Sequence, residues 1–273
     1  MSWNKIHCLI KKEFLYNLRN KRLLILLCAI FLLLMLSVVM YIQQASELGG
    51  YNLNTLVLQN YNIIIQILAL ALIPILSSCI SSEKEVGTWL FYRMNGIKKE
   101  ELVASKIIFY NSIIILFLIL SFVFEIIIMK LFFNLSFTSA VPIKHQIYIL
   151  MLVFSIISLI INSEILISEM TKKSVNAAIY VIIVWFSLMI INGILPYHLG
   201  GGYIAPFTQN SIQTSVMWRL LQNATISPIP FESRLYLPTL NELAIALSIP
   251  IVINIIIIII SLKKRDRACN QII

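Results

Sequence analysis

The chain alternates between long apolar blocks and short polar segments. Six blocks of about 20 residues are long enough to cross the ~30 Å hydrocarbon layer of a membrane as helices. They cover residues 23–42, 61–80, 107–128, 147–167, 175–195 and 242–262. Many of these residues are Ile and Val, but a backbone in lipid must satisfy its hydrogen bonds within its own segment, which favours helices. The pattern predicts an all-α, polytopic membrane protein whose six spans form one domain over residues 23–273.

The first 22 residues follow a different pattern. Their apolar side chains recur at intervals of three or four, which places them on one face of a helix, while basic side chains lie elsewhere around it. This spacing predicts an interfacial helix over residues 1–22 that lies along the inner leaflet. The helix is either a plain amphipathic anchor or an elbow helix that also contacts a cytoplasmic partner. The elbow residues singled out are Lys11, Lys12, Phe14 and Arg19.

Composition and charge add the orientation. The chain is 59% hydrophobic and 12% charged, with a formal net charge of +9, and its mean hydropathy is +0.91. Most of its 21 Lys and Arg residues flank the same ends of the spans, and only Lys130, Lys144, Arg219 and Arg234 fall on the other side. Basic residues near span ends stay cytoplasmic. We therefore expect a multi-pass protein of the cell membrane with both termini cytoplasmic, and no nucleic-acid partner.

Residues 81–106 form the only long charged run between two apolar blocks. The run carries a compact apolar group at Trp89, Leu90 and Phe91, a turn signal at Asn95-Gly96, and then a second charged helical pattern. A solvated loop of ordinary charge content is the simpler interpretation, but the apolar group argues against it. The pattern favours a cytoplasmic hairpin that presses on another protein.

Polar residues within the spans are candidates for a translocation pathway or for helix packing. Gln66 is the deepest polar residue of the second span, and Asn254 lies in the middle of the sixth. Such side chains more often join helices than contact a substrate. Glu125 lies near the outer end of the third span, where contact with water is favoured over a proton relay.

Two other segments carry structural predictions. At the inner end of the fourth span, Glu164 and Glu169 are expected to pair locally with Lys172 and Lys173. The external loop between spans five and six, residues 196–241, predicts one or two short helices that dip into the outer interface.

Catalytic and metal-binding motifs are missing from the sequence. It contains no G-x-x-x-x-G-K-[ST] phosphate-binding loop, no H-E-x-x-H and no G-x-S-x-G. His7, His145 and His198 fall on both sides of the membrane, and the four cysteines have no metal-ligand spacing. We expect no catalytic residue, no cofactor and no metal in this chain.

The basic amphipathic start, the six spans and the segment ISSEKEVGTWLFYRMNGIKKEELVASK, residues 80–106, together resemble the permease subunits of type-2 ABC transporters. The most specific part is residues 82–88, with an E-x-G-T segment and a later Lys before the third span. The long external loop and the terminal K-K-R-D also fit. Met94-Asn95-Gly96 stands where the family commonly has a Leu-Pro turn.

The resemblance implies that a separate ATPase subunit binds ATP and magnesium, and that two permeases, identical or sister chains, form the pathway. A helix around residues 83–93 would sit in a groove of the ATPase. The coupling residues implied are Glu83, Glu85, Val86, Gly87, Thr88, Trp89, Leu90 and Arg93. The cargo would be amphipathic or hydrophobic: a bacteriocin or other antimicrobial peptide, a lipid or a drug. Competing hypotheses are an ion-driven secondary transporter and an ATPase-independent immunity or scaffold protein.

Overall fold

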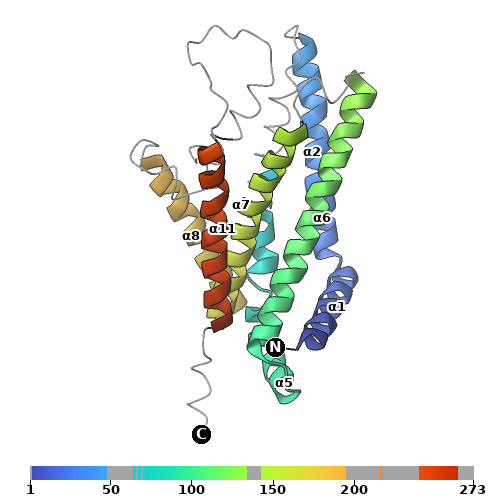
Figure 1. The fold of residues 1–273 in the computed structure, drawn as a ribbon. Coiled ribbons are helices and arrows are strands. Elements are labelled where there is room, and N and C mark those ends of the chain that lie inside the picture. The colour runs from blue at the N-terminus through green and yellow to red at the C-terminus, as the bar shows by residue number, and fades with distance from the viewer. Residues whose placement is uncertain are drawn as a thin grey trace.

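The computed structural model describes residues 2–47, 64–65, 67–68, 70–133, 143–194, 216 and 240–263. Within these residues the regular structure is entirely α-helical, which confirms the predicted all-α class for the described part (Figure 1). The helices are α1 (Trp3–Asn20), α2 (Arg22–Glu47), α4 (Ser81–Glu85), α5 (Thr88–Met94), α6 (Lys99–Phe133), α7 (Ile143–Met170), α8 (Ser174–Ile194) and α11 (Leu240–Lys263).

A sharp bend separates α1 from α2. Lys21 adopts a left-handed conformation (φ 54°), its N–H donates to the Asn17 carbonyl, and the two helices lie 67° apart. The helix predicted over residues 1–22 is therefore present as a separate element, and its position at a membrane interface stays a prediction. Its apolar stripe divides in two: Ile6 packs inside the protein, whereas Phe14 is 51% exposed.

Three described helices are long and apolar enough to cross a membrane: Lys99–Phe124, Ile147–Met170 and Asn241–Lys263. The bent pair α1 and α2 makes a fourth if it counts as one span. Six spans stay a prediction. The span predicted over residues 61–80 lies partly outside the described residues, although positions 64–65, 67–68 and 70–76 are helical. The external loop, 196–241, lies almost wholly outside them.

Helix α7 lies at the centre of the described bundle. In the most apolar stretch of α7, 67% of the residues are buried, against 33% in α6 and 22% in α11. Helix α7 packs against α6, α8 and α11. Its inward side chains, including Leu152, Val153 and Ile156, belong to one continuous apolar core. The helices around α7 keep exposed apolar side chains, as expected for surfaces that lipid or another subunit covers.

The short helices α4 and α5 lie at one end of the bundle. The N-terminus of α1 and the C-terminal end of α11 lie at this same end (Figure 1). The single helix expected around residues 83–93 is wrong, because Gly87 takes a left-handed conformation (φ 83°) that ends one helix and begins the next. A positive φ is accessible to glycine at little cost, so the E-x-G-T segment turns here.

Candidate coupling site

The start of α4 is held by the inner end of α7. Residues 77–80 leave the helix of the second predicted span as a turn, and the backbone N–H groups of Ile80 and Ser81 both donate to Ser168 Oγ at 3.0 Å. Ser168 is fully buried. One side chain of α7 therefore satisfies two backbone donors that a helix beginning at Ser81 leaves without partners.

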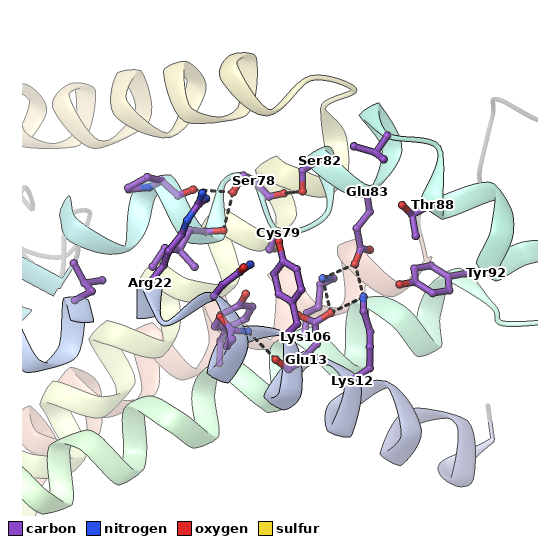
Figure 2. Close-up of a pocket in the computed structure, with 18 of the residues that line it drawn as sticks. Lys12, Glu13, Arg22, Ser78, Cys79, Ser82, Glu83, Thr88, Tyr92 and Lys106 are labelled. Atoms are coloured by element: carbon purple, nitrogen blue, oxygen red, sulfur yellow. Dashed lines mark hydrogen bonds and ion pairs between the residues drawn. The ribbon is translucent and has the colours of Figure 1, made fainter. Parts of the chain in front are cut away.

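Four charged side chains from three helices form a buried ion network (Figure 2). Its members are Lys12 and Glu13 of α1, Glu83 of α4 and Lys106 of α6. Lys106 Nζ lies 3.0 Å from Glu13 Oε1 and 3.1 Å from Glu83 Oε1. Lys12 Nζ lies 2.8 Å from the same Glu83 oxygen and 3.1 Å from Glu13 Oε1. The side chains of Lys106 and Glu13 are 2% and 5% exposed, whereas Lys12 at the edge of the network is 37% exposed.

The electrostatics of the network favour the charged forms of Glu13 and Lys12. Burial alone would raise the pKa of Glu13, but the positive charges of Lys106 and Lys12 outweigh it and hold that pKa below its ordinary value. Burial alone would lower the pKa of Lys12, and the carboxylates of Glu13 and Glu83 instead raise it above its ordinary value. Two acids and two bases therefore balance one another between α1, α4 and α6.

A second set of contacts ties the hairpin to the connection between α7 and α8. Glu85 accepts hydrogen bonds from the Ser174 N–H (3.1 Å) and hydroxyl (2.9 Å), and these bonds lower the pKa of the Glu85 carboxyl. Lys84 Nζ donates to the carbonyl oxygens of Glu169 and Thr171. The same ammonium lies 5.7 Å from the centre of the Trp89 ring. The last two residues of α4, Lys84 and Glu85, thus both form hydrogen bonds with the segment that connects α7 to α8.

The local pairing expected for Glu164 and Glu169 is wrong. Glu169 pairs with Lys99 at the start of α6, at 2.6 Å, while Lys172 and Lys173 are exposed beyond the end of α7. Glu164 is 1% exposed, and among the described residues neither of its carboxyl oxygens has a hydrogen-bond partner. Glu169 therefore pairs with a lysine of another helix and not with the lysines that follow it in the sequence.

Helix α1 also holds the turn of the hairpin. Lys5 Nζ donates to the Gly96 carbonyl at 2.6 Å, and the Ser2 N–H donates to Glu101 Oε1 at 2.7 Å. The elbow helix therefore contacts the hairpin of its own chain at several points. Of the other elbow residues, Lys11 and Arg19 are both exposed.

The outer side of the hairpin carries exposed apolar groups. We define the docking face as Val86, Leu90, Phe91 and Met94, which are 79%, 62%, 64% and 86% exposed. Trp89 instead is half-buried and packs against the core of its own chain. Thr88 is half-buried, and Arg93 is exposed.

Met94 was not among the coupling residues taken from the sequence. The four-residue spacing of Val86, Leu90 and Met94 was the signal that could have found it.

The candidate pathway residue Asn254 lies in a contact between helices. Asn162 of α7 donates to Asn254 Oδ1 of α11 at 2.7 Å and accepts from Asn111 Nδ2 of α6 at 3.0 Å. This chain of amides joins three helices, and Asn111 and Asn162 were not singled out from the sequence. Gln66 and the side chain of Glu125 lie outside the described residues. No group of three or more potential metal ligands occurs among the residues that the structure describes.

Together, an all-helical bundle with apolar spans and a polar hairpin at one end defines a polytopic membrane protein. Residues 8–267 match the model of the ABC-2 family transporter protein family, and the chain belongs to this family. The resemblance to type-2 ABC permeases is thereby confirmed, and the chain is a membrane transport component, not itself catalytic. Comparison with curated proteins and with solved structures found no match.

Proposed function

We propose that this chain is the membrane-spanning subunit of an ATP-driven exporter and that a separate ATPase subunit grips its hairpin. The observation that carries the proposal is the docking face. Four large apolar side chains are exposed together at the end of the bundle where α1 begins and α11 ends. Apolar groups clustered in this way on a polar segment indicate a protein partner.

The opposite side of the hairpin supports a lever. Glu83 joins it to α1 and α6 through the ion network, and Glu85 joins it to α8 through Ser174. A force applied to the docking face would therefore act on three helices at once, instead of being absorbed by a loose loop. ATP and magnesium would be held by the partner ATPase, since this chain has no phosphate-binding loop.

A second permease, identical or a sister chain, completes the proposed pathway. The apolar surfaces that α2, α6, α8 and α11 leave exposed are available for lipid or for that subunit. The expected cargo is amphipathic or hydrophobic, such as an antimicrobial peptide, a lipid or a drug. This class suits helices whose polar groups are mainly Ser and Asn in a largely apolar surrounding.

The test is purification of the tagged chain from its host membranes in mild detergent, followed by reconstitution of the recovered complex into vesicles. We expect an ATPase subunit to co-purify and vesicles to accumulate a labelled cationic peptide only with ATP and magnesium. Transport at the full rate by the chain alone, without ATP, would contradict the proposal and support an ion-driven or ATPase-independent role.

One observation favours ion-driven secondary transport as the second candidate. Glu164 lies within the span Ile147–Met170, is 1% exposed, and has no hydrogen-bond partner among the described residues. Buried carboxyl groups in spans commonly carry protons or ions. The Glu164→Gln variant separates the two candidates: an ATP-driven exporter should keep its ATP dependence, whereas a proton-coupled carrier should lose transport driven by a pH gradient.

A further inference from the structure

A cavity of about 560 Å³ lies between α1, the start of α2, residues 71–82, α5 and α6. Its volume falls in the range of small-molecule sites, about 300–1,000 Å³. In Figure 2, Arg22 and Tyr92 lie on opposite sides of the view, with the ion network between them. Every residue that lines the cavity belongs to the described part of the chain. Val86 of the docking face and the ion network line one side of the cavity, but the proposed coupling role assigns no ligand to it.

The lining of the cavity is amphipathic. Leu26, Ala71, Pro74 and Ile75 form an apolar part, and all four belong to the first two predicted spans. The remainder is mostly polar and comes from α1, Arg22, residues 78–92 and α6, and it includes Asn20, Tyr16 and Thr88. A ligand that fills both parts needs a polar head and an apolar tail.

The charge of the lining determines which charge the polar head group of a ligand should carry. Lys12, Glu13, Glu83 and Lys106 neutralise one another in the ion network. Arg22 is the remaining charged residue of the lining, is exposed, and forms no hydrogen bond or ion pair among the described residues. A guanidinium group binds phosphate through two parallel hydrogen bonds, which makes an anionic phosphate group the matching ligand.

The depth of the cavity fits the same ligand. Arg22 is the last residue before the first predicted span, 23–42, and Leu26 lies one turn inside it. Arg22 therefore lies at the level of lipid head groups on the hairpin side of the membrane, and the apolar lining extends toward the acyl chains. Basic pockets at this depth bind anionic lipid head groups.

We propose that this cavity is a binding site for one anionic phospholipid, with its phosphate on Arg22 and an acyl chain along Leu26, Ala71 and Pro74. The lipid would contact α1, the second predicted span and the hairpin together. It would thus fill the space between the elbow helix and the bundle that the ion network leaves open.

The experiment is native mass spectrometry of the purified full chain, titrated with phosphatidylglycerol or phosphatidylcholine. We expect one tightly bound phosphatidylglycerol. Arg22→Gln should weaken its binding about fivefold, because one basic group near the membrane surface contributes about that much. Arg19→Gln is the matched control, since Arg19 is exposed on the same elbow and does not line the cavity.

A second variant tests the apolar part. Ala71→Phe should fill it and lower the affinity without removing a charge, and circular dichroism should show unchanged helix content. Equal losses from Arg19→Gln and Arg22→Gln, or equal binding of phosphatidylcholine, would overturn the proposal. Displacement of the lipid by millimolar inorganic phosphate would reveal a simple anion site and would overturn it as well. These readouts measure lipid binding and not transport, so they are independent of the proposed export function.

Discussion

Lys106 Nζ of α6 lies 3.1 Å from Glu83 Oε1 of α4, and the Lys106 side chain is 2% exposed. Lys106 also pairs with Glu13 of α1. One buried ammonium group therefore holds together the elbow helix, the hairpin and the helix that leaves the hairpin.

Replacing Lys106 with Met should destabilise the protein strongly. The substitution leaves Glu13 and Glu83 with only the half-exposed Lys12 as a partner, and removing one member of a buried ion pair costs about 3–5 kcal/mol. We expect a large fall in the thermal unfolding midpoint in detergent. Lys98→Met is the control, because Lys98 is exposed on the same hairpin. The triple variant K106M/E13Q/E83Q should recover part of the loss. Wild-type stability of K106M would show that the network contributes little.

Placing a negative charge on the docking face should release the ATPase. Leu90→Asp puts a carboxylate at a position that is 62% exposed, so the chain itself should fold normally. Buried in an interface, that charge should reduce recovery of the ATPase at least tenfold, as for an interface hot spot. Asn95→Asp adds the same charge to the exposed turn of the hairpin, outside the docking face. Equal recovery of the ATPase with L90D and N95D would argue against the docking face.

Gly87→Ala should strain the turn between α4 and α5. No heavy atom lies within 4 Å of the added methyl group, so the effect comes from the positive φ of 83° alone. A left-handed conformation costs about 1–2 kcal/mol for an L-residue with a Cβ atom. Gly87→Asn should cost less, because Asn tolerates this region better. Thermal unfolding of both variants checks the order, and equal stability of G87A and wild type would contradict the assigned backbone conformation.

The bond between the hairpin and α8 should depend on pH. The pKa of Glu85 is lowered by the hydrogen bonds from Ser174. A carboxyl with a lowered folded pKa stabilises the fold above its unfolded pKa, and this contribution is lost as the pH falls through the folded value. Once corrected for intrinsic rates, hydrogen exchange at the start of α8 should thus be slow near neutral pH. It should become faster below about pH 4. Glu85→Gln should weaken this pH dependence, and an unchanged profile in E85Q would assign it to another group.

Hydropathy predicted the helices well because lipid restricts the possible structures. The limits of α8, Ser174–Ile194, differ by one residue at each end from the predicted 175–195. Helix α6 begins at Lys99, well before the predicted residue 107. Its first turns are charged and lie outside the apolar block, but they are helical because α6 packs against α1 and α7.

The side chains of the coupling site were harder to predict. Glu83 carries no local sign that its partners are Lys12 and Lys106, because the pairing depends on how α1 packs against α6. The size of Trp89 indicated an anchor for a partner, but a single sequence does not tell which side of a short helix turns toward its own protein. Val86 and Leu90 are exposed, and their packing against an ATPase stays a prediction. The break at Gly87 was not predicted.

The separation of partners in the ion network has a consequence for biosynthesis. Lys12 and Glu83 are 71 positions apart, and Glu13 and Lys106 are 93 apart. Because a chain emerges from the ribosome from its N-terminus, α1 is synthesised well before either of its charged partners. The ion network can therefore form only after the first two predicted spans and the hairpin have been synthesised. These contacts thus join the earliest part of the chain to segments that are made much later.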